Sequence, residues 1–162
     1  MSAEPLEPAA LRAAAEDLLT DYADLIDSDR LEEWLELFAE ESVYQVLSRE
    51  NYDLGLPAPL ILCTNKNMIR DRVIALRNAN EYNLHYDRHM ISGVRIRPAE
   101  SGLYALQANF ALYQTSQEGQ TMLFSVGRYR DLVRLEAGRL LFIEKTAIVD
   151  TFSVCPLLAT PL

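Results

Sequence analysis

Histidine and cysteine are scarce in this chain, which contains two of each among 162 residues. Cys63 and Cys155 stand far apart and form no Cys-x-x-Cys pattern, so we expect two reduced, buried thiols. His85 and His89 share one short segment, "EYNLHYDRHMISGVRI" (81–96), with Asp87 between them. Any chemistry that needs an imidazole group must therefore use this segment.

Long hydrophobic runs and an excess of positive charge are also absent. No segment reaches the roughly 18 consecutive apolar residues of a membrane-spanning helix. The opening stretch, "MSAEPLEPAA", has neither the basic nor the apolar region of a signal peptide. With a net charge of −9, the chain lacks the clustered Lys and Arg that bind nucleic acids and anionic membranes. We expect a cytoplasmic protein that binds neither.

The composition is that of an ordinary globular protein, with 49% apolar and 24% charged residues. A chain of 162 residues fits one domain with a substantial core. Residues 1–8 are rich in Pro and Glu, and we expect them to be flexible. The predicted domain therefore covers residues 9–162.

The first half of the chain has helical periodicity. Apolar residues recur at steps of three and four, which predicts three amphipathic helices, at residues 8–26, from Asp29 to about 38, and from Thr64 or Asn65 to about 77–83. Asp29 and Glu32 are spaced as a capping box for the second helix. Residues 50–59 contain one Gly and two Pro, which predicts a loop.

The second half alternates with a period of two. This pattern predicts long strands, after a first strand near 43–49, at 89–96, 104–112, 122–127 and 141–149. Gly93 and Gly127 fall inside strands, where glycine often marks a kink or bulge. Helices followed by antiparallel strands predict an α+β domain. We expect three N-terminal helices packed on a strongly curved antiparallel sheet, which forms a cone.

Five stretches in order resemble the small (β) subunits of Rieske-type aromatic-ring-hydroxylating dioxygenases. They are "YADLIDSDRLEEWLELFAEESVY" (22–44), "RENYDLGLP" followed by "NMIRDRVIALRNANEY" (67–82), "HYDRHMISGVRI" (85–96), "FSVGRYRDLVR" (124–134) and the ending "IVDTFSVCPLLATPL". The phrases "NYDLGLP" and "LRNANEY" are most similar to the branch whose complexes act on terephthalate, anthranilate or salicylate.

This resemblance implies a fold, a partner and a set of cofactors. The fold is the cystatin-like cone of nuclear transport factor 2 (NTF2). The partner is a catalytic α subunit, usually in an α3β3 complex with a homotrimer of β subunits. The Rieske [2Fe–2S] cluster and the mononuclear Fe(II) belong to the α subunit, so no cofactor is expected in this chain. The β subunit is a non-catalytic, structural component of the oxygenase.

The residues themselves also argue against iron in this chain. A Rieske centre needs two Cys and two His in short motifs, yet neither Cys63 nor Cys155 has a histidine within 20 residues. His85, Asp87 and His89 match the count of a two-His, one-carboxylate iron site. On a strand, however, they would spread over roughly 13 Å, too far for one ion. We expect no metal, and histidines that hydrogen-bond neighbours such as Asp27 or Tyr44.

A second function remains open at this point. Some stand-alone enzymes with this cone fold, dehydratases and isomerases, place Asp, His and Tyr side chains inside it. Asp27, Tyr44, His85 and His89 could converge in the same way. A His–Asp pair with tyrosine donors suffices to enolise or dehydrate a small ketone. A module that binds a small ligand without chemistry is a third possibility.

Two surface features are candidates for contacts with a partner. Arg128 and Arg130 share one side of a strand, with Asp131 opposite, and either pair with an α subunit or are simply solvated. The tail "FSVCPLLATPL" has no charge in eleven residues. Either it docks on a neighbouring subunit through Leu157, Leu158 and Leu162, or it folds back over its own sheet.

Overall fold

The computed structural model describes residues 5–78, 84–150 and 160–162. Its helices, apart from single 3-10 turns at Leu35–Leu37 and Glu100–Gly102, are α1 (Pro8–Asp27), α2 (Leu31–Trp34), α3 (Arg49–Asp53) and α4 (Lys66–Asn78). Its strands are β1 (Phe38–Ser48), β2 (Ile61–Cys63), β3 (His85–Pro98), β4 (Tyr104–Ser116), β5 (Thr121–Glu136) and β6 (Arg139–Val149). The predicted α+β class is confirmed, and the four long strands β3–β6 follow the last helix, α4, as expected.

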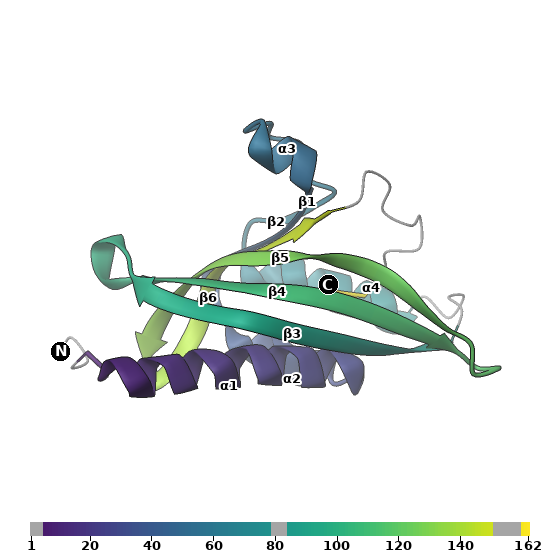
Figure 1. Cartoon of the computed structure of the whole chain (residues 1–162), viewed down its shortest axis with the longest axis horizontal. Coiled ribbons are helices and arrows are strands. Elements are labelled where there is room, and N and C mark those ends of the chain that lie inside the picture. Colours follow the sequence, from purple (N-terminus) through teal and green to yellow (C-terminus); the bar gives the residue numbers. More distant parts are fainter. Residues whose placement is uncertain (1–4, 79–83, 151–159) are drawn as a thin grey trace.

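One six-stranded sheet, in the order β2-β1-β6-β5-β4-β3, forms the wall of the cone. Figure 1 shows the long strands bending together, with α1 running beneath β3 and α4 behind the sheet. The sheet is antiparallel, as expected, except that β1 and β6 pair in parallel. The sequence did not reveal this pair, because β1 meets a strand about 100 residues further along the chain.

The helix starts differ in part from the expectation. Pro8 opens α1, where a missing N–H costs nothing. The predicted capping box is wrong, because Arg30 holds the N-cap position of α2 and Asp29 has a φ of 56°. Asp29 and Glu32 instead bind the guanidinium group of Arg77 on α4, both at 2.8 Å. Asp29 and Glu32, whose spacing predicted a helix cap, thus form ion pairs with an arginine that is distant in the sequence.

The expected loop at 50–59 also contains more structure than predicted. Ser48 accepts a hydrogen bond from the backbone N–H of Asn51 at 3.2 Å, which caps the short helix α3. Further on, β2 pairs with β1, and the helix α4 is capped by Asn65, whose side chain accepts from the N–H of Met68 at 3.0 Å. The cap at Asn65 confirms one of the two predicted starts.

The two strand glycines serve different purposes. Gly93 has a φ of +65° and lies where the pairing of β3 with β4 shifts register, so the predicted bulge is confirmed. At Gly127, a Cβ atom would lie 1.9 Å from the carbonyl oxygen of Ile148. Gly127 is therefore needed for a close approach of β6, and the pairing of β5 with β4 continues through it without a bulge.

Aromatic side chains fill the interior of the cone. Six of them are at most 1% exposed: Tyr22, Trp34, Phe38, Tyr44, Tyr129 and Phe142. Tyr22 meets Tyr129 and Phe142 edge to face, with ring centroids 5.7 and 5.6 Å apart. Such contacts add to the burial energy and fix ring orientations. None of the described helices is long and apolar enough to cross a membrane.

Candidate functional site

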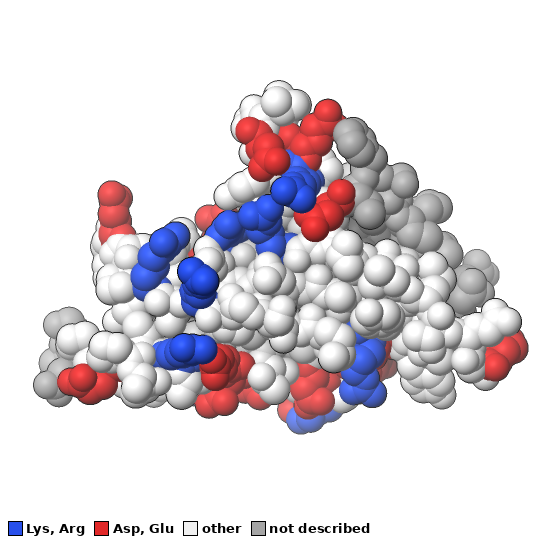
Figure 2. All heavy atoms as spheres, in the orientation of Figure 1, with Lys and Arg blue, Asp and Glu red and all other residues white. Residues whose placement is uncertain are grey.

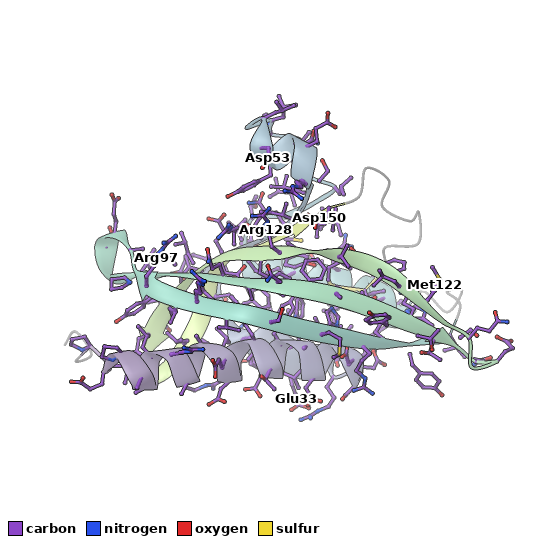
Figure 3. All side chains as sticks on the ribbon, in the orientation of Figure 1. Glu33, Asp53, Arg97, Met122, Arg128 and Asp150 are labelled. Atoms are coloured by element: carbon purple, nitrogen blue, oxygen red, sulfur yellow. The ribbon has the colours of Figure 1, made fainter. Side chains whose placement is uncertain are left out.

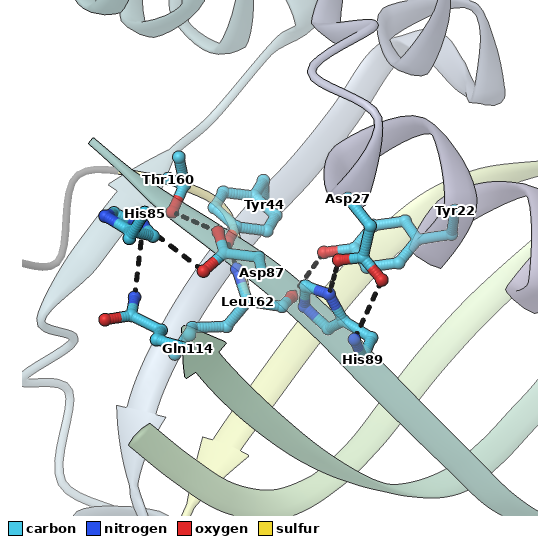
Figure 4. Close-up of polar contacts among 9 residues, drawn as sticks. All are labelled: Tyr22, Asp27, Tyr44, His85, Asp87, His89, Gln114, Thr160 and Leu162. Atoms are coloured by element: carbon cyan, nitrogen blue, oxygen red, sulfur yellow. Dashed lines mark hydrogen bonds and ion pairs between the residues drawn. The ribbon is translucent and has the colours of Figure 1, made fainter. Parts of the chain in front are cut away.

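The inner face of β3 carries a histidine–carboxylate pair. His89 Nδ1 lies 2.6 Å from Asp27 Oδ1, and the other carboxylate oxygen accepts the backbone N–H of His89 at 2.8 Å (Figure 4). Their side chains are 0% and 6% exposed. Because Asp27 ends α1, the pair fastens that helix to the sheet. His89 Nε2 is buried and has no hydrogen-bond partner among the described residues.

Two tyrosines next to this pair bind the backbone of Leu162. Tyr22 donates its hydroxyl proton to the Leu162 oxygen at 2.5 Å, and the Leu162 N–H donates to the Tyr44 hydroxyl at 3.2 Å (Figure 4). Burial raises the pKa of Tyr44 to about 12 and that of Tyr22 well above its usual value. Both phenols therefore stay protonated at neutral pH, and Tyr22 donates a hydrogen bond while Tyr44 accepts one.

A second histidine pair lies at the beginning of β3. His85 Nε2 is 3.2 Å from Asp87 Oδ1 and 3.3 Å from the side-chain nitrogen of Gln114. The other oxygen of Asp87 accepts a hydrogen bond from the hydroxyl of Thr160 at 3.3 Å. Burial raises the pKa of Asp87, while the neighbouring histidines lower it. The inner face of β3 thus binds the final described segment through Asp87.

The structure brings together only part of the predicted acid–base set. Asp27 and His89 are paired, Tyr44 binds Leu162, and His85 belongs to the separate pair with Asp87. The space beside Tyr44 and Trp34 measures about 10 Å³ and holds one water at most. A small ketone has no room there, because core side chains and Leu162 occupy the cone.

The histidine segment is a strand, as expected, and not a helix. His85 and His89 bind different carboxylates, Asp87 and Asp27. Among the residues that the structure describes, no group of three His, Cys, Asp or Glu side chains could hold a metal ion. Cys63 is buried and free, whereas Cys155 lies outside the described residues. The residues present do not fit an iron site.

A buried ion pair was missed by the sequence analysis. Lys145 Nζ lies 2.9 Å from Asp131 Oδ2 and 3.2 Å from the centroid of the Tyr129 ring, and both charged side chains are 0% exposed. Burial raises the pKa of Asp131 to about 6 and lowers that of Lys145 to about 8. The signal was present, since Lys145 falls in the same alternation as the apolar residues Leu141, Ile143, Ala147 and Val149. Its partner on another strand cannot be predicted from spacing.

The outer face of the sheet carries arginines instead. Arg128 and Arg130 project outward from β5 while Asp131 points inward, as predicted. Register places Arg95 on β3 beside Gln107, which also accepts a hydrogen bond from Arg130. Together with Arg97, these arginines form a group that we call the arginine patch (Arg95, Arg97, Arg128 and Arg130). None of them forms an ion pair with a described residue.

The arginine patch borders a groove of about 600 Å³ and covers one half of the outer face. Figure 2 shows its positive charge over that half, and Figure 3 labels Arg97 and Arg128 there, away from Met122 at the other end. The other half is apolar and includes exposed Met90, Tyr113 and Leu123. Methionine, tyrosine and arginine are enriched at protein interfaces.

The candidate tail contacts are only partly visible. Leu157 and Leu158 lie outside the described residues. Leu162 is 1% exposed and belongs to the core of its own chain.

Comparisons with known proteins agree with this geometry. Residues 22–155 match the sequence model of the family described as "Ring hydroxylating beta subunit". The chain is 41% identical to the anthranilate 1,2-dioxygenase small subunit of Burkholderia cepacia, over 87% of this chain and 88% of that one. It is 32% identical to a terephthalate 1,2-dioxygenase terminal oxygenase component subunit β of Comamonas sp., over 87% and 92%.

A solved structure is similar over almost the whole chain. It is the β subunit of a proposed aromatic-ring-hydroxylating dioxygenase from Novosphingobium aromaticivorans, with 38% identity and a TM-score of 0.86, covering 95% of this chain and 98% of that one. The predicted cone fold is thereby confirmed.

Proposed function

The chain belongs to the ring-hydroxylating β-subunit family, and from this membership we propose that it is the structural subunit of an oxygenase that acts on an aromatic carboxylate. The observation that carries the proposal is the identity of 41% to an anthranilate 1,2-dioxygenase small subunit over most of both chains. The space beside Trp34 and Tyr44 supports a role in assembly, because the described residues that line it leave only about 10 Å³, too little for a substrate.

The proposed partner is a catalytic α subunit that holds the Rieske cluster and the mononuclear iron, in a cytoplasmic α3β3 complex with a β trimer. This chain supplies no ligand set for either group in its described residues. The stand-alone dehydratase is not favoured, because His85 is separated from the Asp27–His89 pair and Leu162 takes the tyrosine hydroxyls.

The outer face of the sheet is the proposed contact surface. The arginine patch offers four positive groups that form no ion pair with a described residue, on a molecule whose net charge is −9. Arg128 and Arg130 would pair with carboxylates of a neighbouring subunit, and the apolar half would bury Met90 and Tyr113. Charge complementarity of this kind sets orientation and association rate more than affinity.

Co-expression with the α subunit tests the surface. We expect Arg128→Gln/Arg130→Gln to weaken the complex at least about tenfold, since buried interfacial charge pairs couple by over 1.4 kcal/mol. The matched control, Arg70→Gln/Arg139→Gln, removes the same charge outside the patch and should assemble normally. Light scattering after size exclusion measures both, and equal assembly of the two variants would exclude this surface.

Turnover tests the structural role itself. We expect His85→Gln/His89→Gln to lower oxygenase turnover only in proportion to lost assembly, because neither histidine reaches an open site. Abolished turnover in an intact complex, or iron bound stoichiometrically by this chain alone, would contradict the proposed function.

A further inference from the structure

Residues 160–162 lie in the cone as a bound ligand lies in a pocket. The polar contacts of this segment reach elements far away in the sequence: Thr160 donates to Asp87 on β3, and Leu162 binds Tyr22 on α1 and Tyr44 on β1. Pro161 is buried and lines the small space beside Trp34. A helix and two strands of the scaffold therefore form the walls of this pocket.

The pocket binds both backbone and side-chain groups of residues 160–162. The Tyr22 hydroxyl donates to the Leu162 oxygen, and the Leu162 N–H donates to the Tyr44 hydroxyl, so the two phenols hold the backbone groups on either side of the Leu162 Cα. The leucine side chain enters the apolar core, where Leu162 is 1% exposed. Asp87 selects a hydroxyl two residues earlier. Proline between them limits the conformations that binding must freeze.

We propose that this end of the cone is a peptide-recognition site for the sequence Thr-Pro-Leu, filled here by residues 160–162 and able to take the same tripeptide from another molecule. The inference does not depend on the proposed oxygenase role. It follows from the pocket being built by α1, β1 and β3, elements that lie far from the segment in the sequence and supply all the side chains that bind it. The Asp27–His89 pair stiffens that wall by joining α1 to β3.

The experiment disables the chain's own ligand and supplies a replacement. The full-length double variant Thr160→Ala/Leu162→Gly loses the hydroxyl and the leucine side chain but keeps all the wall residues. The probe is the blocked peptide acetyl-Thr-Pro-Leu-amide, and acetyl-Thr-Pro-Gly-amide is its matched control. Trp34, the single tryptophan of the chain, lines the space beside Pro161 and reports binding by fluorescence.

We expect saturable binding of the leucine peptide to the variant, with a dissociation constant below about 1 mM, the range for a ligand of this size. The glycine peptide should bind at least about tenfold more weakly, because it lacks the buried side chain. Wild-type protein should show no saturable change, since its site is filled. Adding Tyr22→Phe should weaken peptide binding about two- to tenfold, while Tyr52→Phe, an exposed tyrosine, should not.

Three results would overturn the inference. They are the absence of saturable binding by the folded variant, equal binding of the two peptides, and equal binding by wild type. If circular dichroism shows that the double variant does not fold, the milder Leu162→Ala is used. Its melting temperature should fall by about 5–15 °C and rise again by a few degrees with saturating leucine peptide. A melting temperature unchanged by that peptide overturns the proposal equally.

Discussion

The two faces of the same sheet handle charge in opposite ways. On the inner face, Asp27 pairs with His89 and Asp131 with Lys145, so both of these buried carboxylates have a partner within the chain. On the outer face, Arg128 and Arg130 form no ion pair with a described residue. The buried ion pairs therefore hold the cone together, whereas the outer arginines are available to the partner proposed above.

The largest effect should come from breaking the Lys145–Asp131 pair. Lys145→Met leaves Asp131 buried without its cation and should lower the free energy of unfolding by about 3–5 kcal/mol. The double variant Asp131→Asn/Lys145→Met removes both charges and should recover much of that loss. Urea unfolding followed by circular dichroism measures both proteins. A single variant as stable as the double variant would mean that the pair is not a coupled unit.

Breaking the Asp27–His89 pair should cause the second-largest loss of stability. Asp27→Ala removes both acceptors of His89 and should cost about 2–3 kcal/mol, because a buried imidazole and a backbone N–H lose their partner. Asp21→Ala removes an exposed carboxylate from the same helix and should change stability by less than about 0.5 kcal/mol. Thermal unfolding of the two variants measures this difference. Similar losses of stability in both variants would show that the Asp27–His89 pair does not stabilise the fold more than an exposed carboxylate does.

In contrast to the buried pairs, the arginine patch should contribute little to the stability of the isolated chain. Arg128→Gln/Arg130→Gln should change the free energy of unfolding by less than about 1 kcal/mol, because neither guanidinium has an internal carboxylate to lose. Chemical denaturation without the α subunit is the measurement. A loss comparable to that of Asp27→Ala would show that these arginines stabilise the fold and would abolish the contrast between the two faces.

The smallest effect concerns the exposed network of Arg77 with Asp29 and Glu32. The side-chain hydrogen bond from Arg77 lowers the pKa of Glu32 to about 2. The folded pKa of Glu32 thus lies below its value in the unfolded chain, near 4.5. The ion pair therefore stabilises the fold at pH values above 4.5, and this stabilisation is lost as the pH falls toward 2. Because the pair is solvent-exposed, Glu32→Gln should cost less than about 1 kcal/mol at pH 7. The gap to wild type should close between pH 5 and about 2; a gap that persists there argues for another cause.

Periodicity predicted most of the fold, and its failures have physical reasons. Alternation correctly placed Arg128 and Arg130 opposite Asp131, because side-chain direction in a strand is a local property. It could not predict that β1 would pair with β6, or that Arg77 would bind Asp29 and Glu32, since both depend on the tertiary arrangement.

The contacts of the two histidines were also predictable only in part. The strand pattern indicated that His85 and His89 would bind separate neighbours, and Asp27 was named among them. The partner of Lys145 and the return of Leu162 to the tyrosine hydroxyls were not accessible from spacing, because each joins elements that only the folded cone brings together.

The parallel pairing of β1 with β6 has a consequence for biosynthesis. On the ribosome, β1 emerges about 100 residues before the strand that must lie beside it, so its edge waits exposed while translation proceeds. Closing so long a loop is slow compared with forming a hairpin. The edge of β1 is therefore covered only after β6 has been synthesised. Chaperones that bind this edge during the delay should raise the yield of native protein.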